Sequence, residues 1–112
     1  MLNSERRRTP RFPFVAVAEV TEKASATEIV TQVSEISLYG CYIDHKNPFP
    51  PGTTVTLKIF SESEVFEAGA KVLYAHPNLG MGLAYHELSL RSSGILRGWL
   101  SRAQALEEKS RT

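Results

Sequence analysis

The sequence predicts an all-β fold, a small six-stranded antiparallel β-barrel with a C-terminal amphipathic α-helix. Three observations support this prediction. The chain has 112 residues, 42% of them apolar, which is enough for one compact core and too few for two ordinary domains. Short runs rich in β-branched residues alternate with turn signals up to about residue 88. After that point, the spacing of the apolar residues changes to a helical period.

Turn-forming segments separate the six predicted strands. The strands cover residues 14–22, 27–37, 41–43, 54–60, 65–75 and 81–85. The fourth strand has the clearest alternation, since Val55, Leu57 and Ile59 fall on one face and polar residues on the other. The same period places Tyr74 and Tyr85 on the inward faces of the last two strands.

A terminal amphipathic helix is expected after Leu88. Its apolar stripe consists of Ile95, Leu96, Trp99, Leu100, Ala103 and Leu106. Ser92 or Ser93 is available as its N-cap residue. Gly94 and Gly98 each cost about 1 kcal/mol relative to alanine, so the helix must gain stability by docking its stripe on the barrel.

Charge is distributed unevenly along a chain whose net charge is only +1. Residues 1–11 contain four arginines and one glutamate, residues 12–90 are acidic, and residues 91–112 are basic again. The small net charge excludes a globally basic nucleic-acid binder. The pattern divides the chain into a flexible arginine-rich arm (1–12), the barrel with its helix (13–108) and a frayed tail (109–112).

Other classes of protein are disfavoured by the composition. The lone Cys41 forms no intramolecular disulfide and reads as a buried structural thiol. The three histidines lack metal-ligand spacing, and no nucleotide-binding or hydrolase motif occurs, so we expect neither a metal site nor an enzyme. No export signal and no apolar stretch of about 20 residues is present, so a soluble cytoplasmic protein without membrane insertion is expected.

The arm is the first candidate for function. Its four basic residues are all arginines: Arg6, Arg7, Arg8 and Arg11. A guanidinium group can hold a phosphate at two points or pair with the O6 and N7 edge of guanine. The alternative interpretation is a solvated tail that attracts anions without specificity.

The second candidate is the segment from Glu35 to Gly40 at the end of a strand. Glu35 and Ser37 point to the same face, and Gly40 leaves space where a flat ligand could approach the backbone. The carboxylate could accept the N1 and N2 protons of a guanine held by an arginine on its other edge. Alternatively, the segment is a strand end with a turn glycine.

Together, the two segments resemble the motifs of the PilZ domain family. Residues 7–11 fit the pattern R-x-x-x-R, and residues 35–40 fit [D/N]-x-S-x-x-G except that Glu35 replaces Asp or Asn. The resemblance covers nearly the whole chain, including residues 80–85 and the terminal helix. It implies a bacterial receptor for the second messenger cyclic di-GMP, which signals to a downstream effector protein.

The resemblance also implies roles for individual residues. Arg7 and Arg11 would contact phosphate and guanine, while Ser37 and Gly40 would form the floor below the base. An arginine at the position of Arg6 accompanies a stacked pair of ligands in the family, which favours two molecules per domain.

Two alternatives remain open. Glu35 carries one methylene more than Asp, which favours a degenerate adaptor that binds another protein through Leu38, Tyr39 or Phe49 and does not bind cyclic di-GMP. A barrel that binds single-stranded nucleic acid is the other, although the acidic middle of the chain argues against a continuous basic track.

Overall fold

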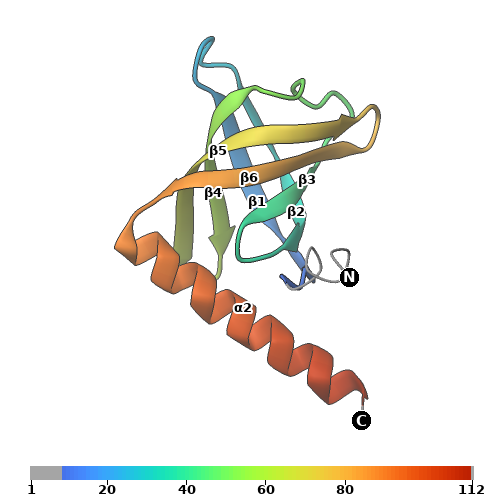
Figure 1. Ribbon diagram of the computed structural model, residues 1–112, viewed down its shortest axis with the longest axis vertical. Helices are drawn as coiled ribbons and strands as arrows, with labels where there is room; N and C mark the ends of the chain where they lie inside the picture. Colours follow the sequence, from blue (N-terminus) through green and yellow to red (C-terminus); the bar gives the residue numbers. More distant parts are fainter. Residues whose placement is uncertain (1–8, 112) are drawn as a thin grey trace, which may run out of the picture.

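The computed structural model describes residues 9–111 and confirms the predicted fold, with six antiparallel strands closed into a barrel and one C-terminal helix in this range (Figure 1). The elements are β1 (Phe12–Glu22), β2 (Glu28–Ile36), β3 (Gly40–Asp44), β4 (Thr54–Ser61), β5 (Glu64–His76), β6 (Gly80–Leu88) and α2 (Leu90–Arg111). Around the barrel the order is β1-β2-β3-β6-β5-β4, with β4 pairing back to β1.

Alternating apolar residues of the strands fill the barrel. Val55, Leu57 and Ile59 of β4 are completely buried, as their period of two predicted. Each such side chain contributes about 1.5–3 kcal/mol through its removal from water. Phe12 is also buried, so β1 begins one residue inside the segment assigned to the arm.

The expected inward orientation of Tyr74 is wrong. The register between β5 and β6 shifts after Val72, because Val72 pairs with Leu83 and Tyr74 pairs with Gly82. This bulge places the extra residue Leu73 in β5 and turns the Tyr74 side chain outward, where it is 38% exposed. A Cβ atom at position 82 would lie 2.3 Å from the Tyr74 ring, so only glycine lets the ring lie across β6.

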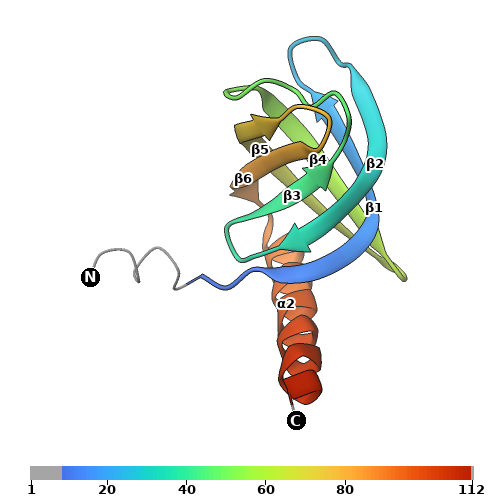
Figure 2. The same cartoon turned by 90° about the vertical axis from the view of Figure 1, so that its right-hand side faces the viewer.

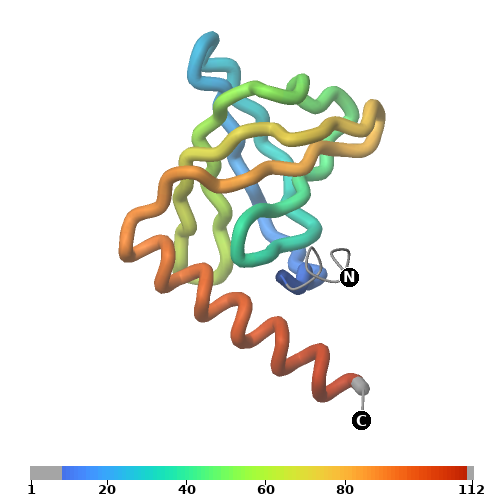
Figure 3. The backbone as a smooth tube through the Cα atoms, in the orientation of Figure 1, coloured from blue at the N-terminus to red at the C-terminus, as the bar shows by residue number. Residues whose placement is uncertain are grey.

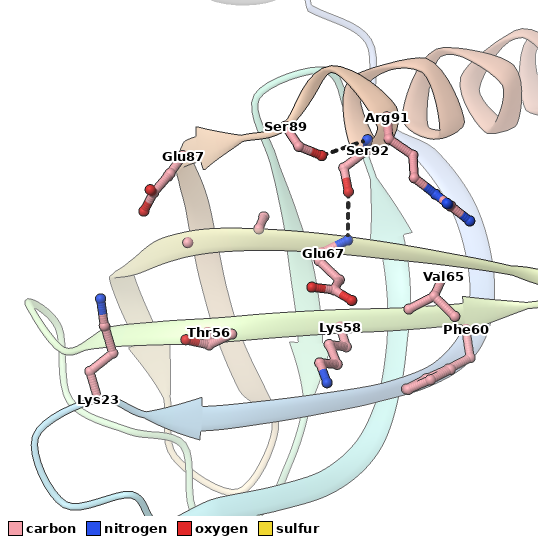
Figure 4. A pocket seen from close by; sticks show the side chains of 12 residues that line it. Lys23, Thr56, Lys58, Phe60, Val65, Glu67, Glu87, Ser89, Arg91 and Ser92 are labelled. Atoms are coloured by element: carbon pink, nitrogen blue, oxygen red, sulfur yellow. Dashed lines mark hydrogen bonds between the residues drawn. The ribbon is translucent and has the colours of Figure 1, made fainter.

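The helix α2 is capped by a different serine from the two that the sequence suggested. The Ser89 Oγ accepts a hydrogen bond from the Ser92 N–H at 3.0 Å, which makes Ser89 the N-cap residue (Figure 4). Ser92 is buried, and its Oγ accepts the Glu67 N–H of β5 at 3.0 Å. Ser92 therefore joins the first turn of the helix to the barrel.

Only part of the apolar stripe of α2 is covered by the barrel. Leu96 and Trp99 are buried, and Trp99 stacks on Phe14 with ring centroids 5.0 Å apart. Leu106 is 68% exposed, contrary to the expectation that it docks on the barrel. The reason is visible in Figures 1 and 2, where the second half of α2 runs past the barrel end. The helix continues to Arg111, and fraying of the tail stays a prediction.

Three segments that are distant in sequence meet at one end of the barrel. The start of β1, the turn between β2 and β3, and α2 lie at this end in both the ribbon and the tube views (Figures 2 and 3). Arg11, the last arginine of the arm, and the segment from Glu35 to Gly40 therefore lie in the same region.

Candidate functional site

A cleft of about 340 Å³ opens where the arm enters the barrel. It brings together four of the predicted site residues, namely Arg11, Glu35, Ser37 and Gly40. The other three, Arg6, Arg7 and Arg8, lie outside the described residues. Two segments separated by a complete strand thus meet in one site.

Arg11 and Glu35 form an ion pair at the mouth of the cleft. The Nη1 atom of Arg11 lies 3.8 Å from Oε1 of Glu35, and their side chains are 62% and 41% exposed. Exposed ion pairs of this kind contribute between zero and about 1 kcal/mol. Both groups can consequently exchange this contact for contacts with a ligand at little cost.

The hydroxyl group of Ser37 forms its hydrogen bonds within the turn between β2 and β3. Its Oγ donates to the Gly40 carbonyl oxygen at 3.1 Å and accepts the N–H groups of Tyr39 (3.3 Å) and Gly40 (3.2 Å). Ser37 is also 93% buried, with 7% of its surface exposed. The hydrogen bonds within the turn explain why a serine occurs at this position without any ligand. The role of Ser37 below a guanine stays a prediction.

Gly40 is required by the packing of β3 against β6. A Cβ atom at this position would lie 2.1 Å from the carbonyl oxygen of Leu83. The carbonyl of Gly40 also accepts the Ser37 N–H at 2.9 Å and the Tyr85 hydroxyl at 3.0 Å. The physical reason for this glycine is therefore the close approach of two strands, in addition to any space that it leaves for a ligand.

Cys41 lies below the cleft and is buried, as expected for a structural thiol. Burial raises the pKa of this thiol to about 12, and it also raises the pKa of the neighbouring Tyr85 hydroxyl. Both groups are neutral at physiological pH. The floor of the cleft thus carries no charge, and the charged groups are at its rim.

An aromatic wall lies along the cleft, and of its residues only Tyr39 was named from the sequence as a contact residue, for a partner protein. Tyr39, Tyr42, Leu73 and Tyr74 line it from the β2–β3 turn, β3 and β5. Tyr42 is the cross-strand partner of Glu35, and its hydroxyl is 3.0 Å from Nδ1 of His76. The bulge in β5 hid this wall from period counting, whereas the strand glycine at position 82 was an available signal of a close approach.

A wider depression of about 700 Å³ lies on the outer face of β4 and β5 (Figure 4). Its walls mix Lys23, Lys58 and Arg91 with Glu67 and Glu87, so its charges largely offset one another. It contains none of the predicted site residues. The cleft at Arg11 is therefore the better candidate site.

Between residues 9 and 111, the structure contains neither a cluster of metal-ligating side chains nor an apolar helix of membrane-spanning length. No group of three or more His, Cys, Asp or Glu residues there could hold a metal ion. The carboxylate of Asp44 accepts hydrogen bonds from Gln32 and Ser34, each at 2.9 Å. Within the same range, α2 is too polar to cross a bilayer.

The fold and the cleft define a small β-barrel binding domain in which an arginine-bearing arm meets a Ser-x-x-Gly turn. The family model of the PilZ domain matches residues 5–102, most of the chain, and the chain therefore belongs to the PilZ domain family. Domains of this family bind cyclic di-GMP and act as receptors or adaptors. A comparison with curated proteins found no match.

Solved structures show the same fold at low sequence identity. The PilZ domain of YcgR from Escherichia coli with c-di-GMP has a TM-score of 0.73 and 12% identity, covering 94% of this chain and 96% of that chain. The Bacillus subtilis inhibitor of motility MotI/DgrA also has a TM-score of 0.73, with 22% identity over 89% of this chain and 52% of that chain. The PilZ domain of CeSA from a cellulose-synthesizing bacterium has a TM-score of 0.62 and 17% identity, covering 87% of this chain and 97% of that chain.

Proposed function

We propose that this chain is a receptor domain for cyclic di-GMP, which orders its arginine arm over the ligand and signals to an effector protein. The observation that carries the proposal is the meeting of Arg11 with the segment from Glu35 to Gly40 in one cleft. The family match and the likeness to a PilZ domain solved with c-di-GMP support it.

Each group in the cleft has a chemical task in this proposal. Arg11 contacts a phosphate or the O6 and N7 edge of a guanine. Glu35 accepts the N1 and N2 protons of the base, and this carboxylate is already oriented toward the arginine. The exposed ring of Tyr39 and the ring of Tyr74 provide stacking surfaces for the purine.

The free energy of ordering the arm explains why the aromatic wall matters. Fixing about five residues of the arm in one conformation costs roughly 5–10 kcal/mol of conformational entropy. Two charge-assisted hydrogen bonds return roughly 3–6 kcal/mol. Stacking of a base on an aromatic ring adds roughly 1–3 kcal/mol for each base, which brings the two sides into balance.

Isothermal titration calorimetry with cyclic di-GMP at fixed salt tests the proposal. The natural chain should bind at micromolar concentration or below, and Arg7→Ala and Arg11→Ala should each weaken binding at least about tenfold. Arg91→Ala, an exposed arginine away from the cleft, is the matched control and should leave the affinity unchanged. No binding heat from the folded natural chain refutes a receptor function.

The stoichiometry is part of the same proposal. With Arg6 present, we expect two ligand molecules per domain, and Arg6→Ala should reduce the calorimetric ratio toward one. A ratio of one in the natural chain contradicts the stacked pair while leaving the receptor function intact.

The second candidate function is an adaptor that does not bind cyclic di-GMP. It is favoured by the ion pair of Glu35 with Arg11, and by the structural reasons for Ser37 and Gly40, which hold without any ligand. Of its expected contact residues, Tyr39 is exposed, whereas Leu38 and Phe49 are partly buried against the core. If Glu35→Asp creates binding that the natural chain lacks, this candidate replaces the first.

A further inference from the structure

A third concave surface lies between the start of β1 and α2. This groove has a volume of about 510 Å³. Pro13 and Phe14 of β1 form one wall, the turn after β4 contributes Ser61 and Glu62, and α2 forms the opposite wall. It shares no lining residue with the cleft at Arg11.

The groove has an apolar floor that is buried at Trp99, partly buried at Phe14 and exposed at Leu106. Phe14 is partly buried and stacks on Trp99, and Leu106 is 68% exposed on the part of α2 that runs past the barrel. The indole Nε1 of Trp99 donates to Glu64 at 2.8 Å, which fixes the ring orientation at the floor. The groove is thus preformed.

The spacing of the groove residues on α2 indicates the shape of its occupant. Trp99, Ala103, Leu106 and Ser110 line the groove at intervals of four, three and four residues. This is the spacing along which one helix packs against another. A second helix packed alongside α2 would contact all four of these positions.

The charges at the rim indicate the chemistry of that helix. Glu62 and Glu107 lie at the groove, and neither forms an ion pair with another residue of the described range. The one cation of the lining, Arg102, is already paired with Glu64 at 3.4 Å. Basic residues on the occupant would complement the two remaining carboxylates.

We propose that this groove docks a basic amphipathic helix of a partner protein. Leu106 and Phe14, which lies on the Trp99 ring, take the apolar face of that helix, and Glu62 and Glu107 take its flanking lysines or arginines. The proposal does not depend on cyclic di-GMP binding, because it rests on a different set of residues.

The only tryptophan of the chain is on the groove floor, so its fluorescence reports occupancy directly. The probes are two synthetic helical peptides of about 18 residues, roughly five turns, one of leucine and lysine and the other of leucine and glutamate. We expect the lysine peptide to shift the Trp99 emission in a saturable manner. The glutamate peptide should leave the emission unchanged. Equal responses to both peptides, or none to either, overturn the proposal.

Variants of two equally exposed leucines separate the groove from general hydrophobic adhesion. Leu106→Lys should weaken binding of the lysine peptide at least about tenfold. Leu79→Lys, at 67% exposure on the turn before β6, is the matched control and should change it less than about twofold. Equal effects of the two substitutions contradict docking at the groove.

A charge reversal and two further measurements complete the test. Glu107→Lys should weaken the lysine peptide severalfold, whereas Glu28→Lys, exposed on β2, should not. If the natural chain forms a dimer in sedimentation experiments, Leu106→Lys should not abolish that dimer. Vesicles of phosphatidylserine should not compete with the peptide. A dimer lost in that variant, or competition by the vesicles, assigns the groove to self-association or to a membrane surface and overturns the proposal.

Discussion

The Nη1 atom of Arg11 and the Oε1 atom of Glu35 are 3.8 Å apart, so the last arginine of the arm faces the carboxylate that precedes the Ser-x-x-Gly turn. Pro13, two residues after Arg11 in β1, is the cross-strand partner of Glu35. The backbone pairing of β1 with β2 therefore determines that the two charges meet. A ligand that enters the cleft inserts between them or replaces their contact.

Replacing Glu35 separates its role in binding from its role in stability. Glu35→Ala should weaken cyclic di-GMP about tenfold or more, because it removes a charged acceptor for guanine. The free energy of unfolding should change by less than about 1 kcal/mol, since both side chains of the ion pair are largely exposed. Calorimetry and urea denaturation measure the two effects. Unchanged or tighter binding in Glu35→Ala contradicts the assigned role.

Tyr39 offers a clean test of the aromatic wall. Its side chain is 65% exposed, and the turn uses only its backbone, whose carbonyl oxygen accepts the Tyr85 N–H at 3.0 Å. Tyr39→Ala should lower cyclic di-GMP affinity about fivefold or more through lost stacking, with little change in the melting temperature. Tyr39→Phe should retain most of the affinity. A Tyr39→Ala variant that binds like the natural chain rules out stacking at this position.

Gly40→Ala should destabilise the barrel whether or not a ligand is present. The added methyl group meets the Leu83 carbonyl oxygen at 2.1 Å, and overpacking of this kind costs about 1–3 kcal/mol or more. Gly94→Ala is the contrasting control, because nothing lies within 4 Å of its added Cβ and alanine favours a helix by about 1 kcal/mol. Chemical denaturation should show opposite signs for the two variants. If Gly40→Ala is as stable as the natural chain, the close approach of β3 to β6 is wrong.

The stability of the domain should decrease in alkaline solution partly because of Cys41. Burial raises the pKa of the thiol from its ordinary 9.0 to about 12, so the unfolded thiol ionises before the folded one. This contribution is fully present below pH 9.0 and is lost as the pH rises toward about 12, at roughly 1.4 kcal/mol per pH unit.

Cys41→Ala isolates the contribution of the thiol. Urea denaturation at about pH 8, 9 and 10 should show a shallower decrease of stability in this variant than in the natural chain. The Tyr85 hydroxyl, whose pKa burial also raises, adds a further decrease above its ordinary 10.0 in both proteins. Identical pH profiles between about pH 9 and 10 disprove the thiol contribution.

The N-cap of α2 gives a test of the helix boundary. Ser89→Ala should lower the free energy of unfolding by about 1 kcal/mol, because it removes the acceptor of the Ser92 N–H. Ser93→Ala should have a much smaller effect, because the Ser93 hydroxyl accepts no N–H of the first helical turn among the described residues. Equal losses in both variants, measured by thermal unfolding, contradict the assignment of the cap.

The sequence predicted the architecture well where its period was regular. In β4 every second residue enters the core, and each inward position of Thr54–Phe60 was identified correctly. In β5 the extra residue Leu73 changes the side on which Tyr74 emerges, and no local pattern signals which residue is extra. The misplaced Tyr74 is the reason that the aromatic wall was missed.

Only those residues of the candidate site that belong to a sequence motif could be predicted from the sequence. The pattern from Glu35 to Gly40 identified the turn, but the physical reason for Gly40 depends on Leu83, a residue of a distant strand. The apolar stripe of α2 likewise predicted a helix that docks on the barrel along the whole stripe. Leu106 is exposed instead, because the spacing of apolar residues does not indicate where the barrel ends. Contacts between distant segments determine both outcomes.

The most direct test of the central claim is the mapping of backbone amide shifts by nuclear magnetic resonance during a titration with cyclic di-GMP. We expect the largest changes at Arg11, at residues 35–42 and at Leu73 and Tyr74. Residues around the depression at Lys58 and Arg91 should remain unchanged. Shifts confined to that depression, or no shifts at saturating ligand, contradict the claim that the cleft at Arg11 and Glu35 is a cyclic di-GMP site.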